Sequence, residues 1–237
     1  MASDPTPQRP LRIGVFHEDV QMADLVGLDI IGNLSVKNMQ TVCSLVPELT
    51  PMLPLATPME FLYISSTLSP ASMTPETSVN PTHTYATAPR DLDVILIGGP
   101  DPSKVHPDSL TFLREAVGSG EGKAKVVMTT CTGGMWLAAS GVLEGRKATT
   151  NRMLLGKAKE MFPGVEWCDQ RWVVEEGEGK GTEIWTAGGA GCGIDMMAEY
   201  VNKHFDQKLV GLGLGGLDFD PEGPHGQFYT QPLPTSL

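Results

Sequence analysis

The sequence predicts an α/β fold in which a mostly parallel sheet is covered by helices on both faces. Short apolar runs that suit buried strands recur along the chain. Segments with apolar residues at helical spacing separate these runs, and such alternation is typical of parallel sheets with two covered faces. Ligands of these sheets bind beyond the carboxyl ends of the strands, so we expect functional residues directly after strands.

The first half of the chain contains three predicted strands and one predicted helix. The strands are the apolar runs at 11–16, at 61–65 and at 92–100, the last of which ends in a glycine pair. Apolar residues at helical spacing predict a helix over 22–34. Several prolines predict that 35–58 is irregular after its first turns, and 69–84 is rich in turn residues.

The second half continues the same alternation. A helix is predicted over 107–120, because proline stands near its start and glycine at its end. A buried strand follows at 124–130. The remaining expected elements are a helix that begins at 133 and stops at Gly141, a short strand at 146–151, an amphipathic helix at 153–162, a hairpin at 171–189 and a last helix at 193–205.

We divide the chain into a flexible lead-in at 1–10, a single domain at 11–210 and a Gly/Pro-rich tail at 211–237. The stretch "GLGLGG" (211–216) matches the glycine pattern of dinucleotide-binding loops, but no βαβ unit follows it, so we expect a flexible segment. From its length alone, the tail with His225 and Phe228 is a candidate to reach a neighbouring site.

Charge and composition exclude several classes of partner. The net charge of −11 argues against nucleic acid and anionic membranes as partners, because both would repel the surface. No apolar stretch approaches the length of a membrane helix, and the polar N-terminus does not resemble a signal peptide. The four cysteines and five histidines are scattered, without the spacing of a metal site or a disulfide framework. We therefore expect a cytoplasmic protein with no metal and no cofactor.

Cys131 is the main candidate for chemistry. It stands between a buried strand and a glycine-rich helix start, which is the arrangement of a nucleophile elbow. The first N–H groups of the helix would stabilise a thiolate, lower the pKa of the thiol and bind a developing negative charge. The alternative from the local pattern is a small buried thiol without a function.

Carboxylates near the end of the first strand are candidate proton donors and acceptors. Asp24 and Asp29 lie on the first predicted helix, and Glu18 is a rival because it directly follows the strand. The alternative is that Asp24 caps the helix and Asp29 is solvated. The pair Gly98–Gly99 either offers a backbone N–H to the site or forms a tight turn.

Cys192 lies in a second glycine-rich helix start. It is either another thiol with a low pKa or one of several small residues that let the helix pack closely on the sheet.

The stretch "VVMTTCTGGMWLAASGVLEGRKATTN" (126–151) resembles the ThiJ/PfpI superfamily, which shares the flavodoxin-like three-layer fold of class I glutamine amidotransferases. The likeness extends to "DVILIGGP" (93–100) and to 171–197. Thr132 stands where the peptidase-like members have histidine, and "QMADLVGLDIIG" (21–32) is similar to the isocyanide hydratase branch. Leu28 and Asn151 depart from that branch, where proline and histidine are common.

By position, this resemblance implies that Cys131 is the nucleophile and Asp24 the catalytic acid, and that Gly99, Thr132 and Gly133 line the substrate pocket. It implies a homodimer and a small electrophilic substrate. The expected reaction is hydration of an isocyanide to an N-formamide through a thioimidate on Cys131. Two alternatives stay open: an enzyme that acts on 2-oxoaldehydes, and a non-catalytic redox sensor or binding protein.

Overall fold

The computed structural model describes residues 9–177, 179, 181–219 and 226–231. A central sheet of seven strands has the spatial order β11-β12-β8-β7-β1-β3-β6. All neighbouring pairs are parallel except β11 and β12, which form the antiparallel hairpin expected at 171–189. The strands are β1 Leu11–Phe16, β3 Met59–Ser65, β6 His83–Thr84, β7 Val94–Ile97, β8 Val126–Thr129, β11 Trp172–Glu175 and β12 Glu183–Ala187.

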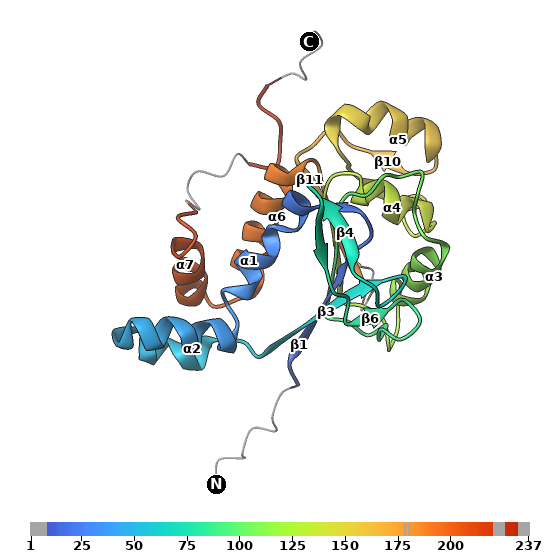
Figure 1. The fold of residues 1–237 in the computed structure, drawn as a ribbon. Helices are drawn as coiled ribbons and strands as arrows, with labels where there is room; N and C mark the ends of the chain where they lie inside the picture. Colours follow the sequence, from blue (N-terminus) through green and yellow to red (C-terminus); the bar gives the residue numbers. More distant parts are fainter. Residues whose placement is uncertain (1–8, 178, 180, 220–225, 232–237) are drawn as a thin grey trace.

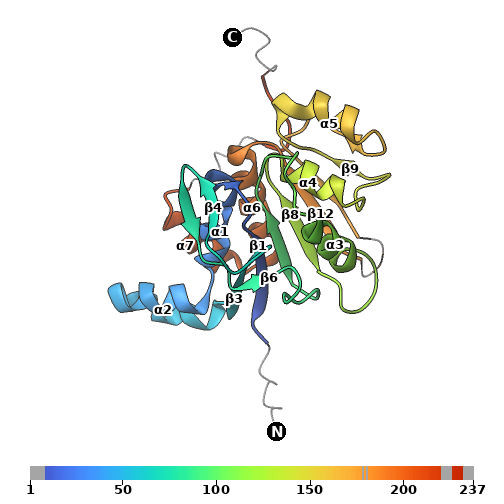
Figure 2. The same cartoon turned by 45° about the vertical axis from the view of Figure 1, so that its right-hand side comes forward.

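Helices cover both faces of this sheet. Figure 1 and Figure 2 show α1, α6 and α7 on one side and α3 and α4 on the other. This three-layer arrangement is the flavodoxin-like α/β fold that the sequence and its resemblance predict. The α-helices are α1 Gly27–Gly32, α2 Val36–Leu45, α3 Pro107–Ala116, α4 Gly133–Ala139, α5 Leu155–Met161, α6 Ala190–His204 and α7 Gln207–Gly215.

Shorter elements complete the described chain. The strands β2 Val20–Gln21, β4 Ala71–Thr74 and β5 Thr77–Val79 form a small sheet, and β9 Lys147–Ala148 pairs with β10 Glu166–Trp167. Three 3₁₀ segments are present: η1 Met22–Leu25, η2 Pro47–Leu55 and η3 Arg152–Leu154. The helix expected over 22–34 is therefore two short pieces, η1 and α1.

The core lies on both faces of the central strands, where aromatic side chains fill the space under α3 and α4. Phe16 packs edge-on against Tyr85 and Phe112 and at a tilt against Trp136. The indole N–H of Trp136 donates to the Ser109 hydroxyl at 2.8 Å, so this buried polar group is paired. The side chains of α4 thereby anchor the helix that follows Cys131.

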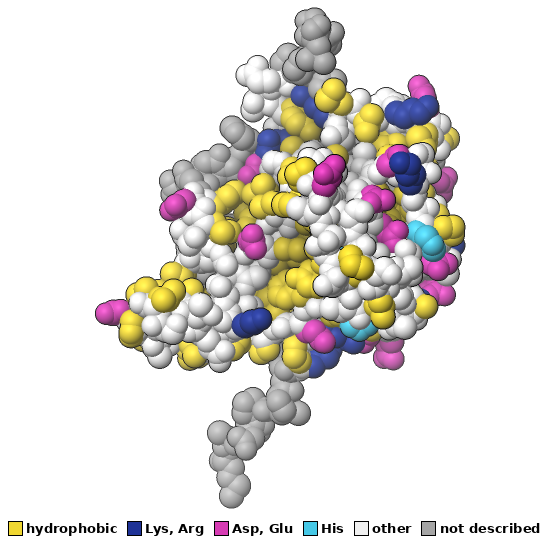
Figure 3. All heavy atoms as spheres, in the orientation of Figure 1, with side chains coloured by type: hydrophobic (Ala, Val, Ile, Leu, Met, Phe, Trp, Pro, Cys, Tyr) yellow, Lys and Arg dark blue, Asp and Glu magenta, His cyan; other side chains and the backbone are white. Residues whose placement is uncertain are grey.

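The segment 35–58 is helical rather than irregular, which corrects the expectation. The Ser35 hydroxyl accepts a hydrogen bond from the N–H of Asn38 and caps α2. The prolines fall after α2, where η2 accommodates them. Figure 1 shows α2 projecting from the body of the protein, and hydrophobic side chains gather over it in Figure 3.

The expectation of a flexible glycine segment at 211–216 is also wrong, because residues 207–215 form α7. Asp206 caps this helix by accepting from the N–H groups of Lys208 and Leu209. A Cβ on Gly213 would lie 2.7 Å from the Leu34 side chain, so glycine allows α7 to approach the end of α1 closely. The boundary expected at 210 falls inside α7. Most of the lead-in at 1–10, and His225, lie outside the described residues.

Candidate active site

Cys131 lies in a strained turn between β8 and α4. Its φ is +58°, a left-handed conformation that only a few per cent of non-glycine residues adopt. The backbone N–H of Cys131 donates to the carbonyl of Gly188. The carbonyl of Cys131 accepts a hydrogen bond from the Thr150 hydroxyl at 2.8 Å. The residue is 8% exposed. The geometry is that of the predicted nucleophile elbow, with the thiol recessed beneath the surface.

Asp24 reaches the same site from η1, at the carboxyl end of the neighbouring strands. Its side chain is buried, and its Oδ2 accepts a hydrogen bond from the N–H of Gly99 at 2.9 Å. Its Oδ1 is buried without a hydrogen-bond partner among the described residues. Burial raises the pKa of Asp24 from 3.8 to about 6, against the opposing effects of the Gly99 N–H and the Cys131 thiol. This carboxyl can therefore exchange a proton near neutral pH.

The pKa of Cys131 is raised, whereas the helix start was expected to lower it. Burial is the main cause, and the negative charge of Asp24 adds to it. Asn151 Nδ2, 3.2 Å from the sulfur, and the N–H of Thr132 act in the opposite direction but do not outweigh burial. At neutral pH the resting pair consequently holds one proton on sulfur, beside a mostly ionised carboxylate.

The three predicted pocket residues lie beside this pair, and the N–H groups of Gly99 and Gly133 are already hydrogen-bonded. A Cβ on Gly99 would lie 2.8 Å from Asp24 Oδ2 and 2.5 Å from Thr132 Oγ1. The Thr132 hydroxyl donates to the carbonyl of Pro100 at 2.6 Å. The N–H of Gly133 is bound to the carbonyl of Thr130. The N–H of Gly99 faces the site, as one of the two alternatives for Gly98–Gly99 has it, but it is bound to Asp24 rather than free.

The other candidate carboxylates are placed differently. Glu18 accepts hydrogen bonds from the Ser65 hydroxyl and the Ser66 N–H after β3, so its carboxylate is committed to that loop. Asp29 is exposed on α1, as the alternative of a solvated carboxylate expects. Of the three, Asp24 is the carboxylate that influences the ionisation of Cys131.

Sequence reasoning missed two supports of the thiol. Gly188, which follows β12, accepts the Cys131 N–H, and Thr150 holds the Cys131 carbonyl. Asn151 was noted as a departure from the resemblance, but its hydrogen bond to sulfur was not expected. The only local signal was the position of "ATTN" and "AGG" directly after short strands. Cys192 is buried in the first turn of α6, with its Sγ 3.7 Å from the Tyr229 hydroxyl.

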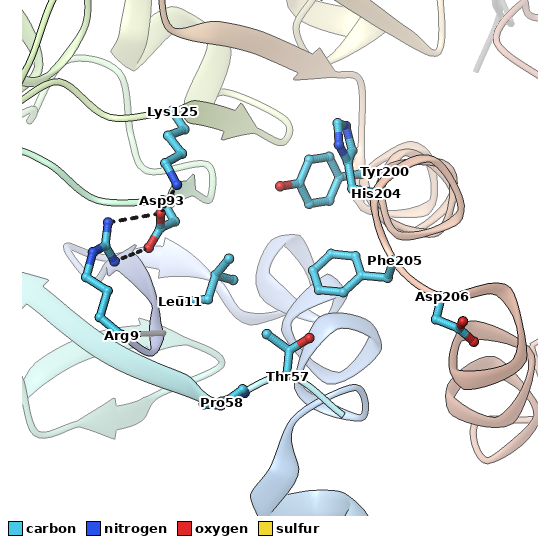
Figure 4. Close-up of a pocket in the computed structure, with 10 residues that line it drawn as sticks. All are labelled: Arg9, Leu11, Thr57, Pro58, Asp93, Lys125, Tyr200, His204, Phe205 and Asp206. Carbon is cyan, nitrogen blue, oxygen red and sulfur yellow. Dashed lines mark hydrogen bonds and ion pairs between the residues drawn. The ribbon is translucent and has the colours of Figure 1, made fainter. Parts of the chain in front are cut away.

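A cavity of about 570 Å³ lies away from Cys131, at the amino ends of the strands (Figure 4). Arg9 and Lys125 both pair there with the buried carboxylate of Asp93. Tyr200 and Phe205 form an aromatic wall. The lining residues include no thiol. The charges of Arg9 and Lys125 are already paired with Asp93. Cys131, at the opposite edge of the sheet, is where a parallel sheet offers its ligand site.

Comparison with known proteins now identifies the class. The chain matches the DJ-1/PfpI family over residues 51–203, and it belongs to that family. Cys131, Gly99, Thr132 and Gly133 lie inside this range, and Asp24 lies before it. The family contains cysteine-dependent enzymes as well as regulators without enzymatic activity.

Solved structures share the fold. A THiJ/PfpI family protein from Pseudomonas syringae is 20% identical, with a TM-score of 0.68 over 95% of this chain and 85% of that one. Drosophila melanogaster DJ-1beta is 14% identical, with a TM-score of 0.65 over 90% of this chain and 100% of that one. The chain is also 26% identical over 125 residues to a beta-ketoacyl-[acyl-carrier-protein] synthase III from Cereibacter sphaeroides, and this match spans 39% of that protein and 52% of this chain.

Two further properties concern the described residues alone. None of their helices combines the length and apolar character needed to cross a membrane. Their His, Cys, Asp and Glu side chains form no group of three that could hold a metal ion.

Proposed function

We propose that this protein is a cysteine-dependent hydratase that converts isocyanides to N-formamides. The observation that carries the proposal is the pairing of a recessed thiol with a buried carboxyl whose pKa is about 6 and whose Oδ1 has no partner among the described residues. A nucleophile beside a group that titrates near neutral pH meets the requirement for combined nucleophilic and acid–base catalysis.

The reaction begins with transfer of the thiol proton from Cys131 to the Asp24 carboxylate. The sulfur then attacks the terminal isocyanide carbon, and an S–C bond forms. Asp24 returns the proton to that carbon, which gives a thioimidate. This transfer removes the need for a free thiolate at rest, so the raised pKa of Cys131 does not prevent the attack.

Water completes the reaction. Asp24, ionised again, accepts a proton from the water that attacks the thioimidate carbon and passes it to nitrogen. The tetrahedral intermediate then expels sulfur, and its hydroxyl proton returns to the thiol through Asp24. The product is the N-formamide, and one isocyanide and one water are consumed.

The depth of the thiol supports a slender electrophile. Cys131 is 8% exposed, so a reacting carbon at the end of a linear group reaches it more easily than a branched carbonyl. Burial also disfavours the redox-sensor alternative, because the readily oxidised form of cysteine is the exposed thiolate. The 2-oxoaldehyde alternative is distinguished by its hydroxyacid product.

The test is to incubate the protein with aliphatic and aromatic isocyanides and to measure formamide. We expect turnover by the wild type and by Cys168→Ser, which replaces a half-buried thiol away from Cys131, and none by Cys131→Ala. Failure of the wild type on the whole panel, or equal turnover by Cys131→Ala, would overturn the proposal. Hydroxyacid formation from methylglyoxal without isocyanide turnover would favour the alternative.

The remaining expectations are proposals as well. We propose a cytoplasmic homodimer, supported by the exposed apolar side chain of Leu45 (77% exposed) beside Val46 at the end of the projecting α2. Sedimentation equilibrium should give twice the chain mass of 25.4 kDa. A monomer at micromolar concentration would contradict the dimer.

A further inference from the structure

We propose that Tyr229, from the C-terminal tail, is a positioning residue for the Cys131 nucleophile. This inference rests on the proposed function, since it assumes that the geometry of Cys131 matters for a reaction. Tyr229 lies beyond the family match at 51–203. It belongs to the tail segment 226–231, which contacts the same backbone that supports Cys131.

The tail segment is bound to the start of β11. The N–H of Arg171 donates to the carbonyl of Gln227 at 2.8 Å, and the Gln227 side chain donates to the carbonyl of Trp172 at 3.0 Å. Figure 1 shows the segment 226–231 near α6 and β11. Phe228, which was expected to reach a neighbouring site, is 63% exposed, and the next residue, Tyr229, turns back onto its own chain.

Arg152 clamps the ring of Tyr229. Its guanidinium lies 3.9 Å from the ring centroid and donates to the carbonyl of Gln231 at 2.8 Å. Both oxygens of Asp169 accept from the same guanidinium, at 2.7 and 2.9 Å, which fixes its plane. Arg152 directly follows Asn151, the residue whose side chain donates to the Cys131 sulfur.

The hydroxyl of Tyr229 fills a slot beside Gly188. A Cβ on Gly188 would lie 2.5 Å from the Tyr229 hydroxyl and 3.3 Å from Cys192 Sγ, so only glycine leaves room there. The carbonyl of Gly188 accepts the Cys131 N–H that holds the strained elbow. Tyr229 and Arg152 together therefore brace two of the groups that hold Cys131: the Gly188 carbonyl that accepts its N–H and the Asn151 side chain that donates to its sulfur. Loss of the brace would loosen a backbone conformation that is unfavourable on its own.

The direct test is the hydrogen exchange of the Cys131 amide, followed by NMR. In Tyr229→Ala we expect this amide to exchange at least about tenfold faster, because the carbonyl that accepts its hydrogen is no longer held. The matched control is Phe228→Ala, which removes the adjacent, exposed ring and should leave the rate unchanged. Tyr229→Phe keeps the ring beside Arg152 but removes the hydroxyl that fills the slot at Gly188, so its exchange rate should lie between those of the wild type and Tyr229→Ala.

Arg152→Gln supplies a second route to the same result. It should accelerate exchange to a similar degree, and the double variant with Tyr229→Ala should add little, because the two side chains act as one brace. With an isocyanide substrate, Tyr229→Ala should lower kcat about tenfold with KM nearly unchanged, as expected for a displaced reacting group.

The outcomes separate this proposal from the proposed function. Wild-type exchange at Cys131 in both Tyr229→Ala and Arg152→Gln would overturn the brace, whatever the activity. The same acceleration in Phe228→Ala would also overturn it. If the wild type hydrates no isocyanide, the proposed function fails, and the exchange rates alone still decide the role of Tyr229.

Discussion

Replacement of Asp24 by asparagine tests the electrostatics of the site without the substrate. Asparagine has the same shape as aspartate, and its carbonyl oxygen can still accept the Gly99 N–H that lies 2.9 Å from Oδ2. The substitution removes the buried negative charge. Because burial raises the pKa of Asp24 in the folded state, the ionised wild-type carboxylate opposes folding, and the variant is relieved of that cost.

The size of the effect follows from the shift. The pKa rises from 3.8 to about 6, and such a shift corresponds to about 3 kcal/mol of unfolding free energy. Below the unfolded value the carboxyl is protonated in both states and contributes no cost. As the pH rises towards and through the pKa of Asp24 in the folded state, the unfolding free energy of the wild type decreases by this amount. That of the variant does not. The stability of Asp24→Asn relative to the wild type should therefore increase by about 3 kcal/mol from acid to neutral pH.

Urea unfolding of both proteins at a series of pH values from about 4 to 7.5 measures this difference. An asparagine amide without a partner at the Oδ1 position would add an offset, but the offset is the same at every pH and cancels in the comparison. Equal slopes of unfolding free energy against pH for the two proteins would refute the reasoning. Asp24 would then not be a desolvated carboxyl, and its proposed role in proton transfer would lose its basis.

Three further substitutions test other parts of the site and the fold. Gly99→Ala should lower the unfolding free energy by about 1–3 kcal/mol, since the new Cβ would lie 2.5 Å from Thr132 Oγ1, and thermal unfolding measures this. Asn151→Ala removes the donor 3.2 Å from sulfur, so the alkylation of Cys131 by iodoacetamide should shift to higher pH. Asp93→Asn should destabilise the protein by about 1.5–3 kcal/mol at neutral pH and by less in acid. The reason is that the partners that lower the pKa of Asp93 stabilise its charged form, which is lost in acid. Urea unfolding at pH 7 and at pH 3 measures the difference.

The alternation of strands and helices could be predicted from the sequence because each buried strand is a continuous apolar run. The elbow at Cys131 could be predicted for a related reason, since a strand, a small-residue turn and a helix start follow one another within ten residues. Two helices were missed. The prolines near α2 belong to the following 3₁₀ segment, and the glycines of α7 serve close packing on Leu34, a contact between distant parts of the chain.

The candidate site was predictable in its residues but not in its electrostatics. Local pattern favoured a lowered thiol pKa at the start of α4, but the pKa depends on burial, which only the assembled fold determines. The supports at Gly188 and Thr150 come from segments 19 to 57 residues away, and nothing near Cys131 in the sequence indicates them. The same holds for Tyr229.

The central claim is that Cys131 and Asp24 act as a pair that shares one proton. The most direct measurement is kcat/KM for isocyanide hydration as a function of pH, in the wild type and in Asp24→Asn. We predict that the wild-type kcat/KM decreases as the pH drops below about 6, the pKa of Asp24, because the carboxylate becomes protonated. It should decrease again in alkali, as the thiol loses its proton. The acid limb should vanish, with most of the activity, in Asp24→Asn. A wild-type profile that is flat from pH 5 to pH 8, or an acid limb that persists in the variant, would contradict the claim.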